Sequence, residues 1–227
     1  MDRNTLKALQ LCPLFLGFAP EEICFALEKI PYRFVRFEKK EFYILAGTPC
    51  KYVDIVVHGE MSVRIASPSG KSMQVNTKSM GSLLAPSFIF AKDNAIPVSM
   101  ECTKPTTLLR MAPEMLQRLM DNDQRIRENF ILQLSNTCNY MAAKVRMLTL
   151  HTVREKVAIF LLQEAKRNNS DTFTLTKSRQ EIADSFAVQK FSLQRSLKEF
   201  AEEEIISLDG KHISILKKDE LISIAES

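Results

Sequence analysis

One unbroken helical pattern divides this chain into two parts and constrains its fold more than any other feature. Residues 126–150 contain neither glycine nor proline, and the residues of a candidate seam recur there at steps of four and three. The seam consists of Phe130, Leu134, Thr137, Met141, Val145 and Leu148. About three heptads of this spacing indicate a long helix that pairs with a second copy of the chain. A helix packed on its own domain would show the same pattern, so both interpretations stay open.

The region before this helix is typical of a small β-domain. Strand-like residues are concentrated in the segments 52–57, 61–65, 72–77, 97–103 and 106–111. Turn residues such as His58-Gly59 separate them, and many short strands at close spacing predict a barrel, roll or sandwich. Met115, Leu116 and Leu119 then fit a short helix, which the residues 121–123 interrupt.

The region after the long helix begins with a new helix. Thr152 and Glu155 have the spacing of a capping box, in which the hydroxyl and the carboxylate satisfy free backbone N–H groups. We therefore place a domain boundary between His151 and Thr152. The predicted organisation is a β-rich domain over residues 1–124, a helix over 125–150 and a C-terminal domain over 151–227, which is an α+β chain.

The C-terminal domain contains a helix-turn-helix pattern. A second capping box, Ser178 and Glu181, opens its first helix. Small Ala183 stands where two helices must approach closely, and Ala187-Val188 forms the turn. The inward-facing residues are Ile182 and Phe186 on the first helix and Leu193 and Leu197 on the second. Two short helices that share a small crossing residue and apolar contacts are expected to form a bihelical unit.

The outward positions of the second helix carry side chains that suit duplex DNA. They are Gln189, Lys190, Ser192, Gln194, Arg195 and Lys198. Arginine and lysine donate to guanine or phosphate, and glutamine pairs with adenine. Any solvated amphipathic helix carries such residues, and residues 151–227 hold 12 basic against 13 acidic side chains, so charge alone does not decide the matter.

A β-hairpin follows the two helices. Asp209-Gly210 lies between the strand-like segments 205–208 and 212–216, which is a strong short-range hairpin signal. Lys211 stands at the tip, where it could reach a phosphate. Three helices followed by a hairpin predict a winged helix.

This order of parts resembles the Crp/Fnr family of bacterial transcription regulators over nearly the full chain. The most specific stretch is residues 178–206, which include Arg179-Gln180-Glu181-Ile182-Ala183. The resemblance implies a β-roll sensor of the cyclic-nucleotide-binding type, a dimerisation helix and a winged helix. It further implies a homodimer that reads a pseudo-palindromic operator in duplex DNA, with RNA polymerase as a further candidate partner.

The resemblance also assigns roles within the DNA-binding domain. Gln189, Lys190, Ser192 and Arg195 would contact bases or backbone, and Arg179 would hold phosphate at the end of its helix. The full candidate set for DNA binding is Ser178, Arg179, Gln189, Lys190, Ser192, Gln194, Arg195, Lys198 and Lys211. Phe191 replaces the acidic residue with which many members read cytosine, and Gln189 replaces the more common serine at the helix cap. A different operator sequence is therefore expected.

The sensor domain lacks the residues that hold a cyclic nucleotide in this family. An ungapped match places Ala85-Pro86 and Ile96-Pro97 where binders carry Gly-Glu and Arg-Ser. Neither pair can bind a ribose hydroxyl or balance a phosphate charge, and an unpaired buried phosphate would cost several kcal/mol. Met141 and Ala142 likewise replace hydroxyl residues that meet adenine. We expect no binding of cAMP or cGMP.

Two interpretations of the β-roll interior remain. A retained pocket would suit a small apolar effector. Its lining would be Leu84, Pro86, Phe88, Ile96, Pro97 and Met141. The alternative is that these residues simply fill the roll and that no effector exists.

Other classes of function find little support in the sequence. A cupin-like metalloenzyme needs clustered histidines, but His58, His151 and His212 lie in three separate regions. G-x-S-x-G, H-E-x-x-H and P-loop patterns are absent, so we expect no enzyme. A protein-interaction module that uses the winged helix to dock a partner protein is the remaining alternative.

Composition and hydropathy point to the cytoplasm. The net charge of +4 permits nucleic-acid binding without showing where the charge lies. Five scattered cysteines without a C-x-x-C pair indicate reduced thiols, with no metal and no cofactor. No apolar run approaches the ~20 residues that span a bilayer, so no membrane partner is expected. Apolar residues 11–19 loosely resemble a signal-peptide end, but Pro13 and Gly17 interrupt them, and we expect them to pack on the first domain.

Overall fold

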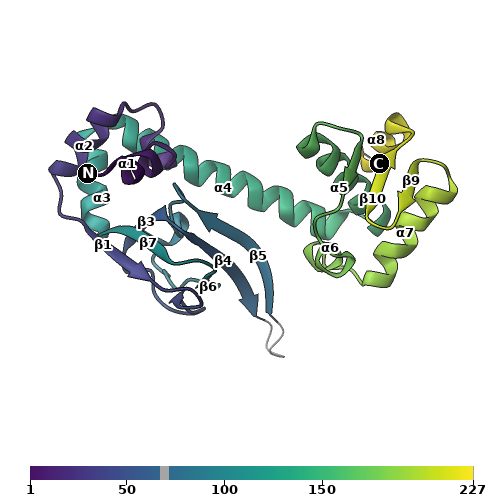
Figure 1. Cartoon of the computed structure of the whole chain (residues 1–227), viewed down its shortest axis with the longest axis horizontal. Helices are drawn as coiled ribbons and strands as arrows, with labels where there is room; N and C mark the ends of the chain where they lie inside the picture. Colours follow the sequence, from purple (N-terminus) through teal and green to yellow (C-terminus); the bar gives the residue numbers. More distant parts are fainter. Residues whose placement is uncertain (67–71, 227) are drawn as a thin grey trace. The chain divides into compact units, whose positions relative to one another are not determined.

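The computed structural model describes residues 1–66 and 72–226 and divides the chain into two compact units. Unit 1 is Met1–Asn139 and unit 2 is Tyr140–Ser227 (Figure 1). Each has a hydrophobic core of its own.

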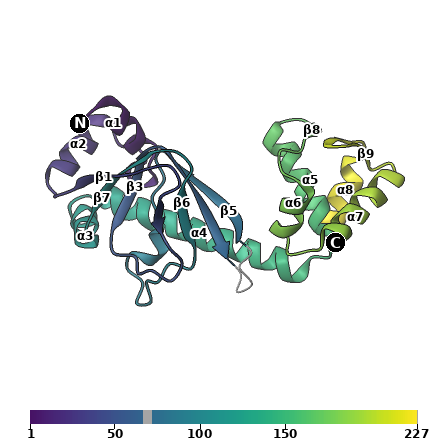
Figure 2. The same ribbon diagram turned by 60° about the horizontal axis from the view of Figure 1, so that its bottom comes forward.

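Unit 1 opens with helices that the sequence analysis did not delimit. α1 (Arg3–Gln10) is N-capped by Asp2, whose Oδ1 accepts from the N–H groups of Asn4 and Thr5 at 3.0 Å each. The 3-10 helix η1 (Pro13–Phe15) and α2 (Pro20–Glu28) follow. The expected packing of the segment 11–19 is confirmed, because Leu14 and Phe15 are buried in the core of unit 1. Together with α3 (Pro113–Asn122), α1 and α2 gather at one end of the sheets in both views (Figure 2).

Two antiparallel sheets form the predicted β-roll. One has the order β1-β7-β3, with β1 (Arg33–Phe37), β7 (Thr106–Met111) and β3 (Val53–His58). The other has the order β2-β6-β4-β5, with β2 (Phe42–Ile44), β6 (Ser99–Cys102), β4 (Glu60–Ala66) and β5 (Ser72–Ser79). All five predicted strand segments are therefore confirmed as β3 to β7.

A buried ion pair joins the strands of this roll. Asp54 on β3 is 0% exposed and accepts two hydrogen bonds from Arg110 on β7, at 2.8 and 2.9 Å. The hydroxyl of Tyr43 on β2 donates to the same carboxylate at 2.8 Å. Burial and the nearby charge of Asp54 raise the pKa of Tyr43 far above its ordinary value, so the phenol stays a donor. One carboxylate thus links strands of both sheets.

The long helix predicted from the sequence is present as α4 (Gln124–Leu150), after α3 (Pro113–Asn122) and a break at Asp123. Its beginning packs on unit 1, where Ile126 and Phe130 are buried. The ring of Phe130 meets that of Phe90 edge-on at 5.8 Å.

Unit 2 contains the predicted winged helix. α5 (Val153–Asn168), α6 (Arg179–Ser185) and α7 (Lys190–Glu202) precede the hairpin of β9 (Ile206–Asp209) and β10 (His212–Ile215). Both capping boxes are confirmed. The hydroxyls of Thr152 and Ser178 accept from the N–H groups of Glu155 and Glu181, and the carboxylates of these glutamates accept from the N–H groups of Thr152 and Ser178. Gly210 in the hairpin turn has a φ of +55°, which explains why glycine stands there.

Two elements of unit 2 lie outside the expectations from the sequence. β8 (Thr172–Thr174) pairs with β10, which makes the wing a sheet of three strands in the order β8-β10-β9. α8 (Lys218–Glu226) follows the wing and packs against α5. The fold class is nonetheless the predicted one, a β-roll, a long helix and a C-terminal winged helix-turn-helix.

Candidate nucleic-acid interface

The apolar underside of the helix-turn-helix is packed as the sequence predicts. Ile182, Ala183 and Phe186 are buried on the first helix and its end, and Leu193 and Leu197 on the second. The ring of Phe186 also meets that of Phe160 on α5 at 5.8 Å. In the turn, Ala187 has a φ of +53° and the N–H of Val188 bonds to the carbonyl of Ala183 at 3.0 Å. These contacts hold α7 in a fixed orientation on α6.

The opposite face of α7 is open to solvent. Phe191 is 73% exposed, and the side chains of Arg195 and Lys198 are 72% and 78% exposed. With Gln194, these residues recur at steps of three and four, so they lie on one face of the helix. Lys190 and Gln189 are exposed at its first turn, whereas Ser192 is only half-exposed. Gln189 is the N-cap, and its side chain makes no capping hydrogen bond within the part of the chain that the structure describes.

Two acidic residues on α7 hold its cations in place. Glu199 accepts from Arg195 Nε at 2.9 Å, and Glu202 lies 3.5 Å from Lys198 Nζ. Exposed pairs of this kind contribute about 0–1 kcal/mol, so a phosphate or a base can replace the carboxylate at little cost. The face therefore offers positioned donors to an anionic partner.

Arg179 lies between the helix-turn-helix and the wing. Its Nη2 donates to the carbonyl oxygen of Gly210 at 2.8 Å. Its Nη1 is buried and has no hydrogen-bond partner among the described residues, and burial lowers the pKa of the guanidinium. The side chain thus joins the start of α6 to the tip of the wing, where Lys211 is exposed.

Two lysines connect the end of α4 to the other helices of unit 2, and the sequence pattern did not predict either contact. Lys144 Nζ donates to the carbonyl oxygen of Ser185, the last residue of α6, at 2.7 Å. Burial and the positive charge of Lys177 lower the pKa of Lys144. Buried Lys156 on α5 donates to the carbonyl oxygen of Leu148 at 3.1 Å, which satisfies one of the free carbonyls in the last turn of α4.

The exposed apolar stripe of α4 differs from the predicted seam at its beginning. Phe130 is 5% exposed and lies in the core of unit 1, and Leu134 is partly buried against the same core. Ile131, Met141 and Val145 are instead 55%, 54% and 60% exposed. Thr137 and Leu148 are half-exposed. Because one side of α4 packs on unit 1 at its beginning, only a neighbouring stripe of the helix is open to a partner there. Phe130 lies on the packed side, so it is not part of the exposed stripe.

The proposed effector pocket is partly filled by the core of the β-roll. Leu84 and Ile96 are each 1% exposed within that core, and Pro86 and Phe88 are half-exposed in the 3-10 helix η2 (Pro86–Phe88). Pro97 is exposed, and exposed Met141 belongs to unit 2. Leu84 and Ile96 therefore act as packing residues. Ala85 has a φ of +45°, a conformation that favours glycine.

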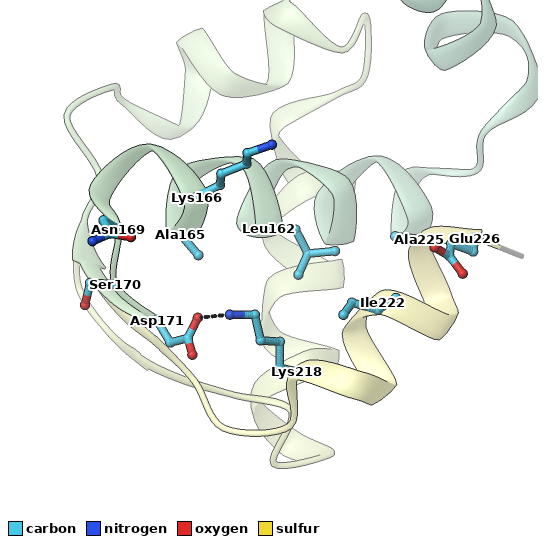
Figure 3. A pocket seen from close by; sticks show the side chains of 10 residues that line it. All are labelled: Leu162, Ala165, Lys166, Asn169, Ser170, Asp171, Lys218, Ile222, Ala225 and Glu226. Carbon is cyan, nitrogen blue, oxygen red and sulfur yellow. Dashed lines mark hydrogen bonds and ion pairs between the residues drawn. The ribbon is translucent and has the colours of Figure 1, made fainter.

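Two cavities among the described residues lie outside the roll interior. One of about 610 Å³ lies between α5 and α8, where Leu162 and Ile222 line it and Lys218 bonds to Asp171 at 2.6 Å (Figure 3). Another of about 300 Å³ lies on unit 1 beside Tyr52 and Arg110.

Among the described residues, no group of three or more histidine, cysteine, aspartate or glutamate side chains could hold a metal ion. None of the helices there combines the length and the apolar composition of a transmembrane span. All five cysteines are free thiols, and Cys138 on α4 is the exposed one.

Comparison with known proteins agrees with this geometry. A family model described as the Crp-like helix-turn-helix domain matches residues 155–224. The transcriptional activator protein Anr of Pseudomonas aeruginosa is 24% identical over 225 residues, which cover 96% of this chain and 91% of that protein. The C-terminal part of the chain matches the Crp-like helix-turn-helix domain, and the chain is similar to activators of this kind over most of its length. Another relative, the activator FnrL of Cereibacter sphaeroides, is 26% identical over 200 residues, which cover 82% of this chain and 76% of FnrL.

Solved structures of Crp/Fnr-like proteins share the fold. CprK complexed with OCPA has a TM-score of 0.67 at 15% identity, covering 90% of this chain and 93% of that chain. FixK2 from Bradyrhizobium japonicum has a TM-score of 0.60 at 17% identity, covering 86% of this chain and 98% of that chain. The two-part architecture is thus shared while the sequences have diverged.

Proposed function

We propose that the chain is a Crp/Fnr-type regulator that binds duplex DNA as a homodimer and reads a pseudo-palindromic operator with α7. The main observation behind this proposal is the exposed face of α7. Buried Leu193, Leu197 and Phe200 pack the other side of the helix into the core of unit 2, so this face points to solvent. A helix of this kind fits the major groove of B-DNA, where its first residues meet base edges. The family model over residues 155–224 and the activators among the relatives support this assignment.

The contacts divide into base reading and phosphate binding. Gln194 and Arg195 carry the hydrogen-bonding groups that discriminate base edges, with Gln189 at the helix start. Lys190, Lys198 and the wing residue Lys211 are suited to phosphates, with half-exposed Ser192 and the cap residue Ser178 as further backbone contacts. Arg179 joins the start of α6 to the wing through its bond to the carbonyl oxygen of Gly210.

In the proposed homodimer, the second copy supplies a second α7 helix for the second half-site. The exposed apolar residues Ile131, Met141 and Val145 on α4 form a stripe that two copies would bury against each other. Pairing along α4 would bring two α7 helices to half-sites about one turn of DNA apart. We further propose that the β-roll does not bind cyclic nucleotides, since Pro86 and Pro97 offer neither a carboxylate nor a guanidinium.

Selection of bound sequences from a pool of random duplexes tests this function. The proposal predicts enrichment of one motif, bound in a salt-sensitive manner because basic side chains release counterions from phosphate. No enrichment, with binding equally weak for every duplex, would overturn DNA reading. A docking role for the winged helix on a partner protein would then be the better interpretation.

A further inference from the structure

The DNA-facing side of α7 carries one large apolar side chain. Phe191 is 73% exposed, more than any other phenylalanine among the described residues. It precedes Gln194, Arg195 and Lys198 by three, four and seven positions, so it lies on the midline of the same face. The buried residue Phe200 lies on the opposite side of the helix.

Folding of the free chain gives no reason for an aromatic ring at this position. A phenylalanine gains stability by burial, because its ring removes much apolar surface from water. Phe191 gains nothing of this kind in unit 2, whose core is closed by Leu193, Leu197 and Phe200. A ring surrounded by Lys190, Gln194 and Arg195 is also poorly suited to a broad apolar partner. Its partner should be a small apolar group within a polar, anionic surface.

On the basis of the function proposed above, we infer that Phe191 is a specificity-determining residue that contacts the C5-methyl group of a thymine. Base edges in the major groove present hydrogen-bond donors and acceptors, and the thymine methyl is the apolar group among them. A phenyl ring cannot accept from the amino group of cytosine or donate to guanine. Each half-site should therefore carry a T·A pair opposite the first turn of α7.

The neighbouring side chains fix where this thymine lies. Phe191 is in the first turn of α7, the part of a recognition helix that comes nearest to base edges. Arg195 is one turn further along the same face. Once its bond to Glu199 is broken, its guanidinium can bind either a base or a phosphate. The thymine should thus lie within a base step or two of the pair that Arg195 reads.

Deoxyuridine substitution tests the inference at the level of a single methyl group. In the duplex enriched from the random pool, each thymine is replaced in turn by deoxyuridine, which removes only the C5-methyl. One thymine per half-site should be sensitive, with affinity falling about fourfold for one half-site and about fifteenfold for both. Phe191→Ala should bind the unmodified duplex more weakly by a similar factor and should no longer respond to deoxyuridine at that position.

A matched control variant and the effect of deoxyuridine on affinity distinguish the possible outcomes. Phe25→Ala removes an exposed ring from unit 1, where Phe25 is 61% exposed, and should leave the deoxyuridine response intact. The inference is overturned if the duplex binds but no thymine responds, or if Phe191→Ala keeps the response. Failure to enrich any duplex would instead overturn the proposed function, and the inference with it.

Discussion

Arg195 combines high exposure with a fixed direction. Its side chain is 72% exposed, and an i,i+4 bond to Glu199 at 2.9 Å holds it along the open face of α7. If it reads a base, Arg195→Ala should cost about 1–3 kcal/mol on the selected operator and relax selectivity at one base pair. Titration of matched and mutated duplexes measures both effects.

Arg167 provides the control for this variant. It is 66% exposed on its side chain and pairs with Glu164 at 3.3 Å, but it lies at the end of α5. Arg167→Ala should leave affinity and selectivity unchanged. Equal affinity and selectivity for Arg195→Ala and the unaltered protein would show that α7 does not read DNA as proposed.

Position 86 and position 97 decide the response of the β-roll to nucleotides. Pro86 is half-exposed and Pro97 exposed, and neither can replace a carboxylate or a guanidinium. A cyclic phosphate without a balancing charge would lose several kcal/mol of binding energy. Isothermal titration with cAMP or cGMP should therefore show no binding, and micromolar affinity for either would refute this prediction.

Residue contacts were predictable where they are local. Both capping boxes could be found because their partners are three residues apart, and spacing alone defines them. The bond from Arg179 to Gly210 spans 31 positions, and that from Lys144 to Ser185 spans 41. Such contacts depend on how the elements pack, which the sequence pattern does not contain.

At the scale of elements, the ion pair of Asp54 and Arg110 should be the strongest single link in the β-roll. Arg110→Met would leave a 0% exposed carboxylate without its charge partner. Loss of one member of a buried pair costs about 3–5 kcal/mol, so urea should unfold the variant at much lower concentration. The double variant Asp54→Asn with Arg110→Met should recover part of this loss.

The pair of Arg36 and Glu38 on the surface of the same domain is the matched control. Both side chains are 69% exposed, with 3.2 Å between the charged atoms. Arg36→Met should change the free energy of unfolding by less than about 1 kcal/mol. Similar stabilities for Arg36→Met and Arg110→Met would argue against the role given to Asp54.

Elements with a strong pattern were predictable and weak ones were not. β3 is buried along its first five residues, four of which are valine or isoleucine, so it stands out in the sequence. β8 has three residues with one buried side chain, Phe173, so it gives too little signal to delimit. On α4, Phe130 of the predicted seam lies in the core of unit 1, and the spacing of apolar residues does not state whether they face their own domain or a partner.

At the scale of the whole molecule, α4 should hold two copies together. Val145→Glu places a carboxylate on the exposed stripe, where pairing would bury it without a partner charge. The dimer dissociation constant should rise by about 100-fold or more, which sedimentation equilibrium measures. Leu216→Glu, at a residue 58% exposed in unit 2, should leave the dimer intact. A monomeric unaltered protein at micromolar concentration would contradict the role of α4.

In the proposed complex, two α7 helices joined through α4 read two half-sites on one face of the duplex. Insertion of five base pairs between the half-sites of the selected operator turns one of them by about half a turn. The dissociation constant should then rise by about 100-fold or more, toward the value for unrelated DNA. An unchanged dissociation constant on the lengthened duplex would contradict the account.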